Sequence, residues 1–336
     1  MRWGRLRALG YPPQWRAGKP GRHTSAMTRL PTLLLLLVFT GSLGLALGAS
    51  TVFARRLDRL GSRLGWPEAL VGLLTATAAD APELTSAIIA IAHGSAAVGA
   101  GVVVGSNLFN LAAMVGAVAL VTQVPIRIGR KDLIEEVGVA LAVTGSATLV
   151  VAGLLPAWIG LAACGVATFL YIEGLDLPRR PPAPLRRRAK AVGIAALELP
   201  AIALITLGSL GMVRSALVLA DRWSVSDAVV GLVVLAWLTS LPNAFTALRL
   251  GLAGRGDALV SETLHSNSIN MAGGLLIPAL FVTTTGASAG ALGLLFGLTA
   301  LTLAPLAVRG SLGRRSGAAI VVAYAAAAAV LVSGGA

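Results

Sequence analysis

Runs of apolar residues follow one another along most of the chain, and short polar or basic stretches separate them. A helix needs about 20 apolar residues to cross a hydrocarbon core of ~30 Å, and the runs have about this length. The pattern therefore predicts membrane-spanning helices. Ten are expected, at residues 31–53, 66–94, 96–121, 133–152, 156–173, 191–213, 225–252, 257–282, 286–307 and 316–334.

The same pattern occurs twice, because a shift of 160 residues brings the second half of the chain onto the first. The residues that coincide are Pro82 with Pro242, Ser106 with Ser266, Asn107 with Asn267 and Asn110 with Asn270. Each copy holds an odd number of helices, so the second copy would enter the membrane from the opposite face. The sequence thus predicts an all-α integral membrane protein of about ten transmembrane helices, built as two inverted five-helix repeats.

Two segments fall outside the predicted repeats, which are assigned to residues 31–174 and 191–336. Residues 1–30 are basic and rich in Gly and Pro, and we interpret them as an N-terminal extension. Met27 opens the first apolar run and is a candidate for the natural start. Residues 175–190 include the sequence RRPPAPLRRRAK and predict a basic, proline-rich linker at the cytoplasmic headgroups.

Composition agrees with a membrane protein, since 56% of the residues are hydrophobic and only 12% are charged. A soluble domain of this length could not cover its surface with so few polar side chains. The net charge of +13 comes mostly from alternate loops. By the positive-inside rule this distribution places both termini outside and the linker in the cytoplasm.

We therefore expect a multi-pass protein of a bacterial plasma membrane whose main partner is the lipid bilayer, with no nucleic-acid partner. The oligomeric state is left open. Cys164 is the only cysteine, which excludes an intrachain disulfide and a cysteine metal cluster.

Acidic residues inside an apolar run are the first candidates for chemistry. Asp80 and Glu83 are three residues apart, so they project from one face of a helix. A carboxylate within a membrane is costly unless it binds a proton or a cation. Oxygen ligands suit a hard cation such as Ca²⁺ or Na⁺, but the pair also suits a proton. A structural hydrogen-bonded pair is the alternative.

Carboxamides, a further acid and an imidazole extend this set. Asn107 and Asn110, with Asn267 and Asn270 in the second copy, either complete an oxygen cage or join helices by hydrogen bonds. Glu262 is the acid of the second copy within its expected core. His265 lies close to it, which suggests a proton relay, with helix packing as the alternative.

Prolines stand beside these polar residues in both copies. A proline lacks the amide donor of a helix, so it leaves a carbonyl of the preceding turn unpaired. Pro82 and Pro242 therefore predict helix breaks that meet near the middle of the membrane.

Together these residues resemble the signature sequences of the Ca²⁺/cation antiporter superfamily, the sodium/calcium exchanger-like membrane proteins. The family motif G-T-S-x-P-E is similar to residues 78–83, and the tail G-S-N-x-x-N is intact at residues 105–110. In the second half T-S-L-P is kept at residues 239–242. This second signature region is divergent, because Asn243 stands where the family has a glutamate.

The resemblance implies a cation antiporter without enzymatic activity or cofactor, which exchanges Ca²⁺ for Na⁺ or H⁺ by alternating access. It makes Glu83 the primary ligand. Asp80 and Glu262 depart from the family pattern, where a hydroxyl residue and an asparagine stand, and we expect them to serve as a second carboxylate and as the acid of the opposite half. These acids are the expected metal ligands. The neutral ligands would be Asn107, Asn110, Ser240, Asn243, Asn267 and Asn270. Two alternatives remain, namely Na⁺/H⁺-type exchange without Ca²⁺ and a transport-inactive membrane scaffold or sensor.

Overall fold

The structure is a computed structural model, and it describes residues 26–64, 68–122, 125–174, 199–282 and 289–333. The predicted linker at residues 175–190 lies outside this described part, and so do residues 1–25 of the predicted N-terminal extension. Within the described ranges almost every residue is helical, as the apolar runs predict.

The helices follow one another with short connections. The first half contains η2 (Ala26–Arg29), α1 (Thr32–Leu64), α2 (Glu68–Ala92), α3 (Ala96–Phe109), the π-helix η3 (Asn110–Ala117), α4 (Val118–Val121), α5 (Arg130–Val151) and α6 (Ala157–Gly174). The second half contains α8 (Leu199–Trp223), α9 (Asp227–Val229), the π-helix η4 (Val230–Leu235), α10 (Ala236–Thr239), α11 (Leu241–Leu252), α12 (Gly256–Met271), the π-helix η5 (Ala272–Leu276), η6 (Pro278–Leu280), α13 (Ala289–Arg309) and α14 (Arg314–Ser333). Strand β1 (Ile126–Arg127) pairs antiparallel with β2 (Ser311–Leu312).

Apart from the short η2, the described elements make ten helical runs when they are joined across their π-helical and 3-10 segments and across the bend at Ser240. These runs lie at the positions that the apolar pattern predicts. The predicted all-α architecture is therefore confirmed. The ends differ, because α1 continues to Leu64 and α8 to Trp223, beyond the predicted residues 53 and 213. Polar residues such as Arg55 and Arg222 favour helix as well as apolar ones do, so hydropathy alone places these ends too early.

Five of the described helices are long and apolar enough to cross a membrane, or six if a pair bent by 48°, Asp227–Thr239 and Leu241–Leu252, counts as one span. Helices α2 and α12 are not among them, and both carry the predicted acids and carboxamides. The polar residues of these two helices lower their hydropathy, although they lie in the interior of the molecule.

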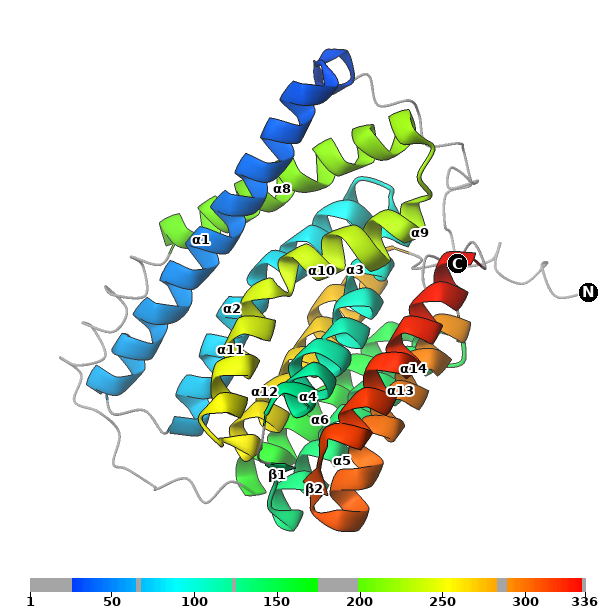
Figure 1. The fold of residues 1–336 in the computed structure, drawn as a ribbon. Helices are drawn as coiled ribbons and strands as arrows, with labels where there is room; N and C mark the ends of the chain where they lie inside the picture. The colour runs from blue at the N-terminus through cyan, green and yellow to red at the C-terminus, as the bar shows by residue number, and fades with distance from the viewer. Residues whose placement is uncertain (1–25, 65–67, 123–124, 175–198, 283–288, 334–336) are drawn as a thin grey trace, which may run out of the picture.

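Helices α1 and α8 form a pair along one flank of the molecule (Figure 1). Arg222 near the end of α8 holds the start of α1, because its guanidinium donates to the carbonyls of Thr28 at 3.0 Å and Leu30 at 2.6 Å. Helix α2 packs against both members of the pair and against α3 and α12. Helices α5, α6, α13 and α14 cover the opposite flank (Figure 1).

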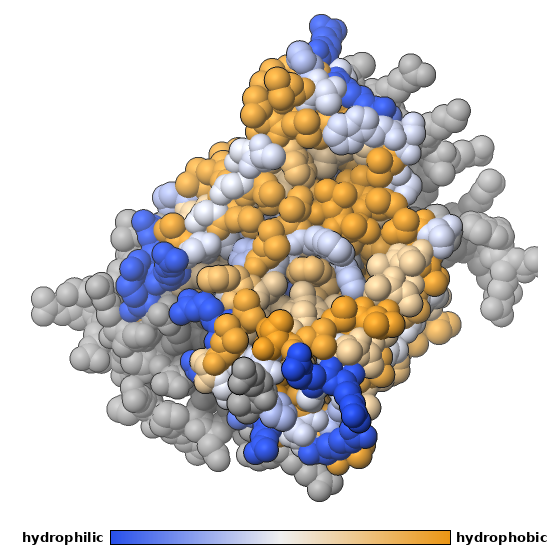
Figure 2. Space-filling view, in the orientation of Figure 1, coloured by the Kyte–Doolittle hydropathy of each residue, from blue (hydrophilic) through white to orange (hydrophobic). Residues whose placement is uncertain are grey.

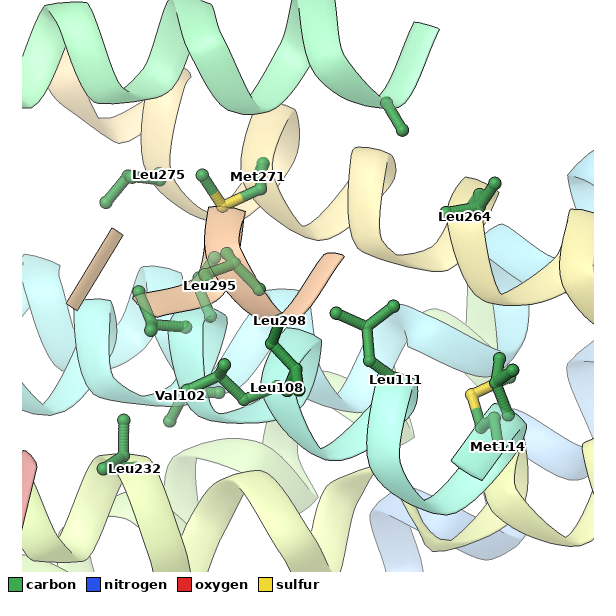
Figure 3. Packing of buried hydrophobic residues seen from close by; sticks show 14 of the residues in the cluster. Val102, Leu108, Leu111, Met114, Leu232, Leu264, Met271, Leu275, Leu295 and Leu298 are labelled. Atoms are coloured by element: carbon green, nitrogen blue, oxygen red, sulfur yellow. The ribbon is translucent and has the colours of Figure 1, made fainter. Parts of the chain in front are cut away.

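The core lies between α3 and α12, and Figure 3 shows part of it. Leu108 of α3, Leu111 of η3 and Leu264 and Met271 of α12 are almost completely buried there. Lipid is as apolar as these side chains, so close packing rather than escape from water stabilises such an interface. This packing fixes the two helices that follow the polar helices α2 and α11 in sequence.

Glycines bring α3 close to η4. A Cβ atom at Gly105 would lie 2.8 Å from the Cα of Leu232 and from the Cβ of Ala236, and it would also overlap the Leu232 carbonyl. Only glycine fits at such a contact, and small residues four apart are typical of tightly packed membrane helices. Gly101 makes the same kind of approach one turn earlier, to Gly231.

Large apolar side chains also cover the outside of the molecule. Leu33, Phe169, Phe245 and Val308 are all well exposed. Figure 2 shows apolar residues across the middle of one face, with strongly hydrophilic residues near its top and lower edges. A water-soluble protein rarely exposes so large an apolar surface. This surface therefore faces lipid.

Candidate functional site

The polar residues of the two halves meet in the interior. Helix α2 brings Asp80 and Glu83, and α11 brings Asn243 with Ser240 directly before it. The remaining residues are Ser106 and Asn107 of α3, Asn110 of η3, and Ser266, Asn267 and Asn270 of α12. All of them are buried, and Asp80 and Glu83 are only 0% and 1% exposed.

Asp80 is held by two side chains of the second half. Its Oδ1 accepts hydrogen bonds from Asn243 Nδ2 at 2.6 Å and from Ser266 Oγ at 2.8 Å. Among the residues that the structure describes, none donates to its Oδ2. Hydrogen bonds to an ionised acceptor are roughly twice as strong as neutral ones. They therefore fix one carboxylate oxygen and leave the other available to a ligand.

Glu83 is held in a similar way, again by the second half. Its Oε1 accepts a hydrogen bond from Ser240 Oγ at 2.5 Å, and its Oε2 accepts one from the amide of Asn270. Each carboxylate thus has one hydroxyl donor and one carboxamide donor.

Asparagines link the helices that follow. Asn107 Nδ2 donates to the Asn267 carbonyl at 2.9 Å, and Asn267 Nδ2 donates to the Asn107 carbonyl at 3.1 Å. Asn110 Nδ2 donates to Ser266 Oγ at 3.0 Å and to Asn267 Oδ1 at 3.1 Å. These bonds join α3 and η3 to α12 directly beside the carboxylates.

Several buried oxygens of this cluster have no hydrogen-bond donor in the described part of the chain. They are Asp80 Oδ2 and the Oδ1 atoms of Asn107, Asn110, Asn243 and Asn270. A buried polar atom without a partner costs about 1–3 kcal/mol, so such a set needs an explanation. Carboxylate and amide oxygens are the ligands that hard cations prefer. The arrangement is therefore able to hold a cation.

The two prolines behave differently. Helix α2 runs through Pro82 without interruption, so the break predicted there is wrong. Pro82 cannot donate to the Ala78 carbonyl, but Ser50 of α1 donates to it at 2.8 Å and so replaces the missing bond. In the second half the chain does bend, by 48°, between α10 and α11. Pro242 lies there in the first turn of α11, where its missing amide costs nothing.

Glu262 lies on α12 one turn, or about 5.4 Å, before Ser266. Within the described residues no group of three or more acidic, histidine or cysteine side chains is placed to hold a metal ion. The part of Glu262 in the ligand set with Asp80 and Glu83 therefore stays a prediction. His265 is half-buried on the same helix, and its role as a proton relay stays a prediction.

Some buried polar residues on the helices around the site were not predicted. Ser50 carries no local signal, because its partner at Ala78 lies on another helix. Ser209 of α8 bonds to Thr85 at 2.6 Å and was missed for the same reason. Glu136 of α5 is buried and accepts a hydrogen bond from Ser261. Its acidic side chain inside an apolar run was a signal that could have been used.

Comparison with known proteins adds two findings. The sequence matches the model of the family described as sodium/calcium exchanger protein over residues 34–173 and again over residues 194–333. No curated protein matches the sequence significantly.

The fold is similar to solved structures of the sodium-calcium exchanger NCX_Mj. For the crystal soaked with 10 mM Na⁺ and 10 mM Sr²⁺ the TM-score is 0.63 at 20% identity, covering 89% of this chain and 99% of the other. For the crystal without Na⁺ and Ca²⁺ the values are 0.60, 20%, 90% and 100%. The likeness confirms the predicted all-α membrane fold of two repeats.

Proposed function

The chain belongs to the sodium/calcium exchanger protein family of cation antiporters, and from this premise we propose that it exchanges Ca²⁺ for Na⁺ or H⁺ across a membrane. The cation would bind between α2, α3, η3, α11 and α12. The observation that supports this most strongly is the group of buried carboxylate and carboxamide oxygens without hydrogen-bond donors in the described residues. A hard cation would supply the positive charge that this group lacks.

The ligands would come from both halves. Glu83 and Asp80 would provide the negative charge, and Asn107, Asn110, Asn243 and Asn270 would provide amide oxygens. The amide nitrogens of Asn243 and Asn270 already hold the two carboxylates, so their oxygens can face the same cation. Ser240 and Asn267 would orient this set through their hydrogen bonds to Glu83 and to Asn107 and Asn110.

Glu262 and His265 would act outside the ligand set. Glu262 lies one turn away from Ser266 on α12, and its Oε2 is buried without a hydrogen-bond donor among the described residues. A cation or proton on its way to Asp80 would meet this carboxylate. His265, on the adjacent face of the same helix, would pass protons to or from it.

Transport would proceed by alternating access around a site at the middle of the membrane. The two repeats, which we place at residues 31–174 and 191–336, would move against each other and open the site to either side in turn. Both termini would lie outside and the linker at residues 175–190 in the cytoplasm of a bacterial cell. The distribution of basic residues between the loops supports this orientation.

Replacing one carboxylate tests the proposal. In proteoliposomes loaded with Na⁺ or at acidic internal pH, we expect ⁴⁵Ca²⁺ uptake by the wild type. Glu83→Gln keeps the shape of the side chain but removes its charge from a buried site, so uptake should fall by about 100-fold or more, as for loss of a buried charged ligand worth about 3 kcal/mol.

Asp257→Asn is the matched control. This acid is exposed at the start of α12 and bonds to the backbone of Gly129, away from the site. It should leave uptake unchanged. Equal uptake by the wild type and Glu83→Gln, with both proteins folded by circular dichroism, would refute the assignment of the site.

Asn243 favours a second candidate function, the exchange of Na⁺ for H⁺ without Ca²⁺. Both carboxylates that are bonded to α11 and its N-cap, Asp80 and Glu83, come from the first half, and the second half contributes only neutral partners to them. The same vesicles, with a pH-sensitive dye inside, separate the candidates. Na⁺-driven proton movement without ⁴⁵Ca²⁺ uptake would identify Na⁺/H⁺ exchange, and no flux of either ion would identify a transport-inactive scaffold or sensor.

A further inference from the structure

The two hydrogen bonds that link α2 to the start of α11 are equivalent under the internal repeat. Asn243 Nδ2 donates to Asp80, and Ser240 Oγ donates to Glu83. The shift of 160 residues brings Asp80 onto Ser240 and Glu83 onto Asn243. Exchanging the two repeats therefore converts the first contact into the second.

Each of these two contacts contains one acid and one neutral residue. Both acids belong to the first repeat, so the sequence looks one-sided. In the structure the two acids take part in different contacts, because Asp80 bonds to Asn243 and Glu83 bonds to Ser240. The negative charge is thus divided evenly about the axis that relates the repeats, although only one repeat supplies it.

Helix α12 contacts both acids as well. Helix α12 adds one further donor to each, Ser266 to Asp80 and Asn270 to Glu83. Asn107 and Asn267 exchange hydrogen bonds in both directions. These are also equivalent positions under the shift, so the reciprocal bonds mark where the two repeats meet.

We propose that Asp80 with Asn243 and Glu83 with Ser240 form two equivalent half-sites, and that transport requires one carboxylate in each half-site, whichever repeat carries it. The physical reason is that two carboxylates in one contact repel each other, while a half-site without any cannot stabilise a buried cation. One divalent cation would span both half-sites, or one monovalent cation would occupy each. This inference rests on the proposed function.

Exchanging the partners within a half-site tests it. The double variant Asp80→Asn with Asn243→Asp moves a carboxylate over a contact of only 2.6 Å between isosteric side chains. It should keep ⁴⁵Ca²⁺ exchange within about threefold of the wild type, less than 1 kcal/mol in binding. Asp80→Asn alone leaves one half-site without charge and should reduce exchange by about 30-fold or more, roughly 2 kcal/mol.

We call the exchange of partners inside one half-site a within-site variant, and the transfer of a carboxylate from one half-site to the other a between-site variant. A between-site variant is the control, because it keeps the total charge and changes only its distribution. Glu83→Gln with Asn243→Asp retains two acids but places both in one half-site. We expect this variant to be as impaired as Asp80→Asn. Charge number is the same in the active and the inactive double variants, so only the distribution separates them.

The half-site of Glu83 and Ser240 gives an independent pair of variants, which can be used if the variants of Asp80 and Asn243 do not fold. Glu83→Gln with Ser240→Asp is the exchange within it, and aspartate is favoured at the N-cap position that Ser240 holds before α11. Asp80→Asn with Ser240→Asp is its between-site control. The first should be active and the second impaired.

The inference is overturned if folded within-site variants are as inactive as Asp80→Asn, or if the between-site variants transport as well as the wild type. Failure of the proposed function gives a different result, because then the wild type itself shows no exchange. Size-exclusion profiles and circular dichroism identify the folded variants before transport is compared.

Discussion

Single hydroxyl groups keep the polar backbone satisfied where α2 passes through the membrane interior. Ser50 of α1 donates to the Ala78 carbonyl, which Pro82 leaves without its helical partner. Ser209 of α8 contacts the next turn through Thr85. An unpaired carbonyl in this environment has no water to bond to. Ser50 therefore replaces the bond that Pro82 removes, and α2 continues as a helix past Glu83.

Removing the Ser50 hydroxyl should destabilise the protein. Ser50→Ala leaves the Ala78 carbonyl without a donor, and we expect a loss of about 1 kcal/mol in the free energy of unfolding, as for other hydrogen bonds between membrane helices. Unfolding in mixed detergent micelles measures it. Thr51→Ala is the matched control, because among the described residues the Thr51 hydroxyl bonds within its own helix, to the Leu47 carbonyl. An equal effect of both changes would contradict the account.

The candidate residues were predictable where the signal is local, and their partners were not. The spacing of Asp80 and Glu83 and the repeated asparagines identify the site, because polar groups in apolar helices stand out. The bond from Asn243 to Asp80 depends on how two helices are turned and shifted against each other. The same limit explains why a break was predicted at Pro82, since the donor that replaces its missing bond lies on another helix.

Helices that follow the polar segments are held by glycine contacts and apolar packing. Gly105 of α3 faces the backbone of η4, and the core between α3 and α12 holds the asparagines beside the carboxylates. The order of the helices and the all-α class were predictable from apolar runs, but the ends of α1 and α8 were not. The π-helical segments η3, η4 and η5 were not, because a π turn depends on tertiary packing and leaves hardly any trace in hydropathy.

Filling the contact at Gly105 should separate these helices. Gly105→Ala would push α3 away from the Leu232 carbonyl and is expected to cost about 1–3 kcal/mol or more of stability. The control is Gly138→Ala in α5, where an added Cβ meets nothing within 4 Å. That variant should be neutral or slightly more stable, since alanine favours helix over glycine. Thermal unfolding in detergent compares the two, and the opposite order would refute the role given to this contact.

The whole molecule combines a symmetric architecture with a one-sided sequence. Inverted repeats were predictable because the shift of 160 residues aligns prolines, serines and asparagines without a gap. The distribution of charge about the pseudo-axis was not, because both acids lie in one repeat and only their contacts show that they belong to different half-sites.

Two half-sites with one carboxylate each predict exchange without net charge movement. One divalent cation in one direction and two monovalent cations in the other leave the buried site neutral in both cases. If each exchange cycle carried one net charge across the membrane, a potential of 100 mV would shift the exchange equilibrium by about 2.3 kcal/mol. This corresponds to a change of about 50-fold in the ratio of internal to external Ca²⁺. Setting the potential of proteoliposomes with K⁺ and valinomycin should therefore leave ⁴⁵Ca²⁺ exchange nearly unchanged. A shift of that size would show that the charge count is wrong.

The central claim is that the protein couples the movement of Ca²⁺ in one direction to the movement of Na⁺ or H⁺ in the other, through the site at Asp80 and Glu83. Its most direct test is accumulation of ⁴⁵Ca²⁺ against its own gradient by wild-type proteoliposomes, driven by an opposing Na⁺ or H⁺ gradient. We expect accumulation that collapses when an ionophore dissipates the driving gradient and that is absent with Glu83→Gln. Uptake that only equilibrates Ca²⁺, with or without the opposing gradient, would contradict the account.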